Sequence, residues 1–194
     1  MLLYICFAVL CICLRVVYTK TEAFHLLNPY HTSLLNNIFI FFTWLGDGFF
    51  IIGLGLLFLI LKKRHTALVI ISSYLLSGLV AQVLKYFYKE ARPGALSELA
   101  DYKYFIEGVT YRSGNMASFP SGHTASAFAL CTVLAIGLKN KLALILLLVY
   151  AALVGYSRIY IGQHFLDDVF AGSLIGVVSG IICWMAVYRK TWLY

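Results

Sequence analysis

Residues 119–138 read FPSGHTASAFALCTVLAIGL, a Pro-Ser-Gly-His opening that leads into an apolar run. Roughly 17–25 apolar residues cross a hydrocarbon core about 30 Å thick, so a stretch of this length predicts a membrane-spanning helix. The whole chain has the same character, because 62% of its 194 residues are hydrophobic and only 12% are charged. This composition excludes an ordinary soluble domain and predicts an all-α polytopic membrane protein.

Six transmembrane helices are expected to form one bundle, and residues 1–194 are expected to be a single domain. One span, over residues 38–61, contains Asp47 and is expected to enter the membrane near Trp44. The first span is interpreted as retained and not as a signal peptide, because no basic leader or small-residue cleavage site precedes Lys20. The other five spans are predicted at residues 2–18, 65–87, 119–138, 142–160 and 168–187.

Basic residues are distributed unevenly between the two sets of connections. One set contains no carboxylate, and its basic residues are Lys62, Lys63, Arg64, Lys139, Lys141, Arg189 and Lys190. By the positive-inside rule this side is cytoplasmic, which predicts cytoplasmic termini in a bacterial inner membrane and a site that faces the periplasm or exterior. These loops account for the net charge of +7, so no nucleic-acid partner is expected.

Two segments on the outer side do not fit a simple span. Residues 20–43 mix polar and apolar side chains, and they suit a helix in the membrane interface that frames a lateral entrance. Residues 88–118 form a connection longer than most loops of compact proteins, and its role stays open. Its aromatic side chains fit an interfacial belt better than a lid, and they are Tyr102, Tyr104, Phe105 and Tyr111.

Charged and polar residues gather at the outer ends of three predicted spans. Lys85 and Arg92 are seven residues apart, nearly two helical turns, so a helix ending at Pro93 would present both on one face. Each residue taken alone is equally typical of a basic side chain that anchors a helix end.

The second group is the string Pro120-Ser121-Gly122-His123. Pro in the first turn, with open backbone N–H groups after it, is typical of a helix start that binds an anion, and His123 would face that anion. The same string is also an ordinary helix opening.

The third group contains Ser157, Arg158, His164 and Asp168. His164 and Asp168 are four residues apart, which lets a carboxylate orient an imidazole, although a structural histidine beside a helix cap has the same pattern. Arg158 offers a planar fork that matches phosphate oxygens. Because three spans place polar groups at the same depth, one shared anion site is the simpler explanation.

These strings resemble the signature of the type 2 phosphatidic acid phosphatase superfamily, which also includes glucose-6-phosphatases, bacterial acid phosphatases and vanadium haloperoxidases. The resemblance covers residues 85–168 and departs from the signature at none of the key positions. It implies a six-helix membrane bundle with the active site at the outer membrane–water interface. It also implies a lipid phosphate phosphatase that needs no metal and no cofactor, similar to bacterial phosphatidylglycerophosphate and undecaprenyl pyrophosphate phosphatases.

The resemblance gives each matched residue a role. His164 would attack phosphorus to form a phosphohistidine, Asp168 would orient His164, and His123 would protonate the leaving group. Water would then hydrolyse the intermediate, with His123 as the base. The residues implied to hold the phosphoryl group are Lys85, Arg92, Ser121, Gly122 and Arg158.

The expected substrate is a lipid phosphate or pyrophosphate, and the motifs do not choose among undecaprenyl pyrophosphate, phosphatidylglycerophosphate, phosphatidic acid and lipid A. A vanadate-dependent peroxidase is one alternative function. A non-catalytic lipid-phosphate binding or transport protein is another, although a transporter site is expected near the membrane midplane. Membrane lipids are the expected partners, and the sequence predicts neither protein partners nor an oligomeric state.

Overall fold

The computed structural model describes residues 2–96, 99, 106, 109, 116–136 and 138–188, and these residues form helices and loops with no strand. The chain is therefore all-α, as predicted. The helices are α1 (Leu2–Val17), α2 (Lys20–Leu27), α3 (Ser33–Leu45), α4 (Gly48–Ile60), α5 (Arg64–Tyr88), a 3₁₀ turn at Pro93–Ala95, α6 (Gly122–Ala135), α7 (Lys141–Tyr160) and α8 (Leu166–Tyr188).

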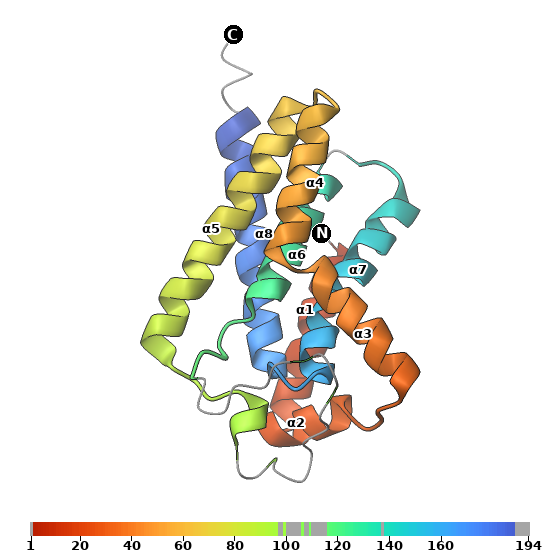
Figure 1. The fold of residues 1–194 in the computed structure, drawn as a ribbon, viewed down its shortest axis with the longest axis vertical. Coiled ribbons are helices and arrows are strands. Elements are labelled where there is room, and N and C mark those ends of the chain that lie inside the picture. The colour runs from red at the N-terminus through yellow and green to blue at the C-terminus, as the bar shows by residue number, and fades with distance from the viewer. Residues whose placement is uncertain are drawn as a thin grey trace.

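Helix α6 lies at the centre of the bundle, with α5, α7 and α8 packed around it (Figure 1). Its contact with α8 is the most extensive and depends on Gly172, Gly176 and Gly180, which recur every four residues. A Cβ atom on Gly176 would lie 2.4 Å from the carbonyl oxygen of Ala125, so only glycine permits this approach. The small-residue spacing thus serves packing within the bundle.

Three helices are long and apolar enough to cross a membrane, namely α5, α7 and α8. The α3–α4 pair passes the same test as one unit, but it is bent by 53° and makes at most a fourth span. Helices α1 and α6 are apolar but shorter than a full span. By length and composition, the described residues thus support three or four of the six expected spans.

The bend between α3 and α4 has a local cause in the string Gly46-Asp47-Gly48. Asp47 is the N-cap of α4, and its Oδ1 atom accepts a hydrogen bond of 2.9 Å from the backbone N–H of Phe49. An aspartate cap starts a new helix and does not continue the previous one. The span predicted over residues 38–61 is therefore interrupted, because the chain makes two helices there, and the pair counts as at most one span.

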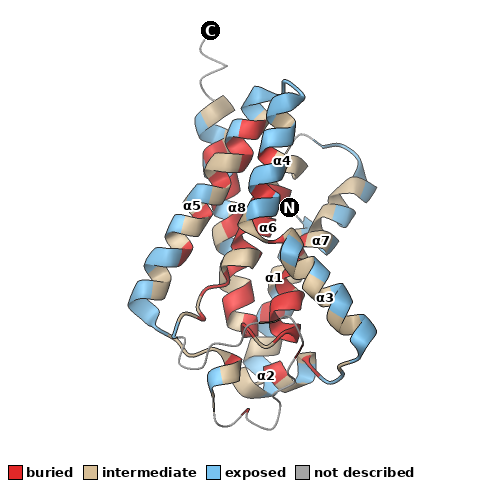
Figure 2. Ribbon diagram, viewed as in Figure 1, coloured by how far each residue is buried: buried red, intermediate tan, exposed pale blue. Residues whose placement is uncertain are grey.

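The outer surface of the bundle is apolar. Leu75, Leu79 and Val83 project from α5 and are about half exposed or more, and large apolar side chains are exposed along α1, α3, α4 and α7 as well. Figure 2 shows the buried residues gathered along the inner faces of α6 and α8, with exposed positions on the outward faces. A continuous apolar exterior fits hydrocarbon and not water, so the protein is an integral membrane protein.

The two ends of the bundle differ in character. The α4–α5 turn and the C-terminal end of α8 lie at one end, whereas the last turn of α5 and the first turns of α6 and α8 point towards the other (Figure 1). The end that contains the α4–α5 turn carries the basic residues Lys62 and Lys63. Arg189 and Lys190, which were assigned to the same side, lie outside the described residues. The predicted aromatic belt, Tyr102, Tyr104, Phe105 and Tyr111, also lies outside them.

Candidate active site

His164 and Asp168 form a buried pair at the start of α8. The Nδ1 atom of His164 lies 3.2 Å from the Oδ2 atom of Asp168, and their side chains are 3% and 0% exposed. The spacing of four residues gives this contact because Asp168 lies in the first turn of α8, just after the loop that carries His164. With Nδ1 donating to the carboxylate, Nε2 keeps its lone pair and is free to act as a base or a nucleophile.

Oδ2 of Asp168 accepts two further hydrogen bonds. The backbone N–H of Phe165 donates at 2.9 Å, and the Ser118 hydroxyl donates through a short contact. Oδ1 of Asp168 is buried and has no partner within the described part of the chain. Ser118 is fully buried and was not predicted, because it precedes the Pro-Ser-Gly-His string and no spacing links it to Asp168.

Burial lowers the pKa of His164 to about 3, and the hydrogen bond and charge of Asp168 oppose this shift only in part. The positive charges of Arg158 and Lys85 lower the pKa further. His164 is consequently a neutral imidazole at physiological pH. A neutral, oriented imidazole has the protonation state that a nucleophile requires.

The Pro-Ser-Gly-His string forms the start of α6. Ser121 is the N-cap, and its hydroxyl oxygen accepts hydrogen bonds from the Thr124 hydroxyl at 2.8 Å and from the Thr124 N–H at 3.4 Å. The backbone N–H of Ser121 donates to the carbonyl of Asp168 at 2.9 Å, which joins the first turns of α6 and α8. Open space lies beside Gly122, where a Cβ atom would meet nothing within 4 Å.

Lys85 lies in the last turn of α5, and its ammonium group donates to the carbonyls of Ala117 and Ser118 at 2.7 and 3.1 Å. Arg92 does not share its helix face, contrary to prediction. Helix α5 ends at Tyr88 because Lys89 adopts a left-handed conformation with φ of 44°. Arg92 instead lies in the following loop and donates to the Gln163 side chain.

Arg158 lies in the last turn of α7 and is 7% exposed. Its carbonyl oxygen accepts hydrogen bonds from the N–H groups of Gln163 and His164, at 3.0 and 3.1 Å, so the turn that carries His164 is fixed to the end of α7. Ser157 is fully buried, and its hydroxyl contacts Thr43 of α3 at 2.9 Å. Gln163, like Ser118, is a neighbour of the site that the sequence did not predict.

His123 follows Gly122 in the first turn of α6. The positive charges of Lys85, Arg92 and Arg158 act on its ring, and so does His164. The segments that carry the three strings therefore lie close together around His123. The Nε2 atom of His123 lies 3.6 Å from the Oδ2 atom of Asp47. Both residues line a cavity of about 710 Å³, whose other walls are Phe41, Thr43, Trp44, Leu45, Phe49 and Phe50.

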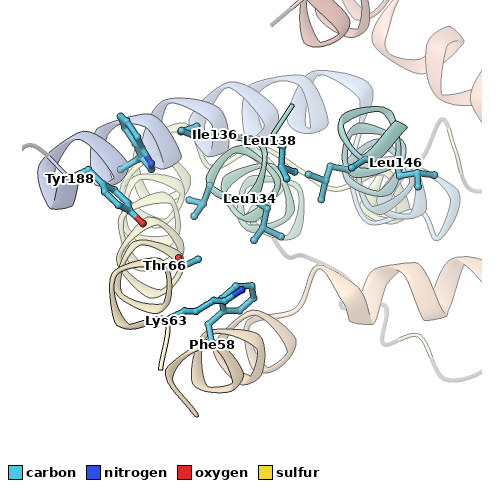
Figure 3. A pocket seen from close by; sticks show the side chains of 12 residues that line it. Phe58, Lys63, Thr66, Leu134, Ile136, Leu138, Leu146 and Tyr188 are labelled. Carbon is cyan, nitrogen blue, oxygen red and sulfur yellow. The ribbon is translucent and has the colours of Figure 1, made fainter. Parts of the chain in front are cut away.

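A second cavity, of about 600 Å³, lies between the α4–α5 turn and the ends of α6 and α8 (Figure 3). Its walls are mainly apolar, with Lys63, Thr66 and Tyr188 as the polar contributors. It contains none of the residues of the three strings and is separate from the site around His164.

Comparisons with known proteins identify relatives of this chain. A family profile described as the PAP2 superfamily matches residues 66–192. A lipid A 4'-phosphatase of Porphyromonas gingivalis is 32% identical over 166 residues, which cover 76% of this chain and 69% of that protein. An undecaprenyl-diphosphatase of Sulfolobus acidocaldarius is 30% identical over 160 residues, covering 81% and 73%.

Among solved structures, that of Aquifex aeolicus LpxE aligns with a TM-score of 0.69 and 34% sequence identity, covering 86% of this chain and 94% of that one. The family match extends over more than half of the chain and includes all three strings. The chain therefore belongs to the PAP2 superfamily.

Proposed function

We propose that the protein is a membrane phosphatase that hydrolyses a lipid phosphate or pyrophosphate through a phosphohistidine intermediate. The observation that carries this proposal is His164, which burial keeps neutral and Asp168 orients, with the positive charges of Arg158 and Lys85 acting on it. Lys85, Arg92 and Arg158 all act on His123, and three cations around one point favour binding of an anion between them. A phosphoryl group supplies that anion, and its oxygens match the guanidinium forks.

In the first step Nε2 of His164 attacks phosphorus, and the bond from phosphorus to the leaving oxygen breaks. Asp168 holds the Nδ1–H and stabilises the positive charge that develops on the ring. Lys85, Arg92 and Arg158, with Ser121 and the Gly122 N–H, stabilise the charge on the equatorial oxygens. His123 donates its proton to the leaving oxygen.

In the second step a water molecule attacks the phosphohistidine and gives its proton to His123. The bond between phosphorus and Nε2 of His164 breaks, inorganic phosphate leaves, and both histidines return to their starting states. Asp168 remains ionised throughout, because it keeps its hydrogen bonds from Ser118 and Phe165. The residues of this chain suffice for every proton transfer in this sequence.

The lipid character of the substrate is supported by the cavity beside His123. Phe41, Trp44, Phe49 and Phe50 line it, and Trp44 and Phe49 are largely exposed, at 71% and 91%. An aromatic cavity that opens on the apolar exterior suits a hydrocarbon chain whose phosphate reaches His123. Lipid A, undecaprenyl pyrophosphate, phosphatidylglycerophosphate and phosphatidic acid share this chemistry, and the named relatives act on the first two.

We also propose the finer topology as one domain with six membrane crossings, made by α1, the α3–α4 pair, α5, α6, α7 and α8. Helix α6 has 14 residues, and at 1.5 Å per residue it is about 21 Å long, which suits a helix whose first turn begins below the surface at the site. Basic residues at the α4–α5 turn support cytoplasmic termini and a site at the outer face of an inner membrane.

The test is phosphate release by the purified protein in detergent with EDTA, against those four lipids and a water-soluble phosphomonoester. We expect release from at least one lipid and its loss in His164→Ala. Release that requires added metal, or that survives in His164→Ala, contradicts the mechanism. Binding without release points to a lipid-phosphate binding protein, and peroxide-dependent halide oxidation with vanadate points to a peroxidase.

A further inference from the structure

A second aspartate–histidine pair lies across the site from the first. Oδ2 of Asp47 is 3.6 Å from Nε2 of His123, which is too long for a hydrogen bond and within the range of an ion pair. The two side chains are 44% and 30% exposed, and both face the aromatic cavity. Asp47 lies outside the three strings and outside the segment matched by the PAP2 profile.

The position of Asp47 is fixed by the packing of the bend between α3 and α4. A Cβ atom on Gly46 would lie 2.4 Å from a methyl group of Val154 and 3.1 Å from the carbonyl of His123. A Cβ atom on Gly48 would lie 2.1 Å from the Tyr74 hydroxyl. The absence of a side chain at Gly46 thus lets the bend lie against the backbone of α6 and the side chain of Val154.

Hydrogen bonds hold the same bend to α6 and α7. The Ser126 hydroxyl donates to the carbonyls of Gly46 and His123, and the Tyr150 hydroxyl donates to the carbonyl of Leu45 at 2.6 Å. Because Ser126 bridges the backbones of Gly46 and His123, main-chain contacts hold residue 47 beside His123.

The carboxylate of Asp47 divides its oxygens between two tasks. Oδ1 caps α4 through Phe49, and Oδ2 faces His123. The charged side chains that act on His123 from the neighbouring segments are cationic, from Lys85 on α5, Arg92 after α5 and Arg158 on α7. A protonated His123 is therefore surrounded by positive charge, and Asp47 is the anion in contact with its ring.

We infer that Asp47 is a positioning residue that holds His123 as the proton donor to the leaving group. Its negative charge stabilises the imidazolium until the proton passes from His123 to the leaving oxygen as the P–O bond breaks. In the second step the proton of the attacking water returns to His123, and Asp47 remains ionised in both steps. This inference rests on the proposed function and assigns a role to a residue outside the three strings.

The test uses the dependence of the rate on the leaving group. An alkyl phosphate needs its leaving oxygen protonated, whereas a nitrophenyl phosphate bearing the same alkyl chain departs as a stable phenolate. General acid catalysis contributes about 10²–10⁴-fold, so Asp47→Asn is expected to lower kcat on the alkyl ester about 10- to 100-fold. On the nitrophenyl ester the loss is expected to stay under about threefold.

The substitution by asparagine separates the two tasks of Asp47. Asparagine is as good an N-cap as aspartate, so Asp47→Asn keeps the cap of α4 and removes only the charge. Asp47→Glu keeps the negative charge, so it is expected to retain more of the rate on the alkyl ester than Asp47→Asn does. Asp167→Asn is the matched control, because Asp167 is paired with Arg15 at the start of α8, and it should leave both rates unchanged.

Each outcome separates the inference from the proposed function. If wild-type protein releases no phosphate from either ester, the proposed function fails. If wild type is active and Asp47→Asn loses the same factor on both esters, or loses nothing on either, Asp47 has no role in protonating the leaving group. A double variant with His123→Asn should be no slower on the alkyl ester than His123→Asn alone, and additive losses would also overturn the inference.

Discussion

The hydroxyl of Ser118 donates a hydrogen bond to Oδ2 of Asp168, although 50 residues separate the two. The same oxygen faces Nδ1 of His164, so Ser118 and His164 share one acceptor. The Ser118 N–H donates to the carbonyl of Glu90 at 3.0 Å, and its carbonyl accepts from Lys85. Ser118 thus connects the end of α5 to the aspartate that orients His164.

Ser118→Ala is expected to lower kcat roughly 10- to 100-fold, because a hydrogen bond to a charged group contributes about 1.5–3 kcal/mol. The loss should come from poorer orientation of Asp168, with little change in KM. Ser72→Ala is the matched control, since the Ser72 hydroxyl donates to the carbonyl of Val69 within α5. Steady-state phosphate release gives kcat and KM for both variants. An unchanged kcat in Ser118→Ala would show that Ser118 does not contribute to turnover.

His164→Ala is expected to lower kcat by at least about 10³-fold, because no other side chain replaces the nucleophile. Asp168→Asn keeps the shape of the side chain but no longer favours the Nδ1–H tautomer, and a loss of about 10³-fold is expected. Thermal unfolding in detergent should show that both variants remain folded. A folded His164→Ala protein with wild-type turnover would refute the assignment of the nucleophile.

His164 should remain neutral in the free protein at about pH 5, because burial lowers its pKa well below the usual value near 6.5. The ¹⁵N NMR signals of the imidazole, assigned by comparison with His164→Asn, should show a neutral ring with its proton on Nδ1. Since the unfolded chain binds this proton near pH 6.5 and the folded protein does so only near 3, acidification between these values should lower stability. A fully protonated His164 ring at about pH 5 would contradict both expectations.

Gly176→Ala is expected to destabilise the protein by about 1–3 kcal/mol, because the added Cβ atom would lie 2.4 Å from the Ala125 carbonyl and 2.8 Å from the Ala129 nitrogen. Gly78→Ala on α5 is the control, since its Cβ atom would meet nothing within 4 Å. Thermal unfolding in detergent compares the two. Equal unfolding temperatures would show that α6 and α8 can move apart without loss of stability.

Local patterns account for the parts of the molecule that the sequence predicted. Apolar runs of sufficient length placed helices α5, α7 and α8, and the spacing of His164 and Asp168 predicted their contact because both lie within one turn of chain. The end of α5 was mispredicted, because Lys89 takes a left-handed conformation before Pro93 is reached.

The sequence by itself determined the membrane class and the residue types of the candidate site, because composition and short spacings act through local geometry. That the glycines of α8 pack against α6 was decided by the tertiary structure. Tertiary structure alone decided that Ser118 contacts Asp168, that Gln163 contacts Arg92 and that Asp47 faces His123. Each of these contacts joins segments far apart in the chain. Their distances depend on how closely helices pack, which in the α3–α4 bend is set by glycine contacts and by hydrogen bonds to backbone carbonyls.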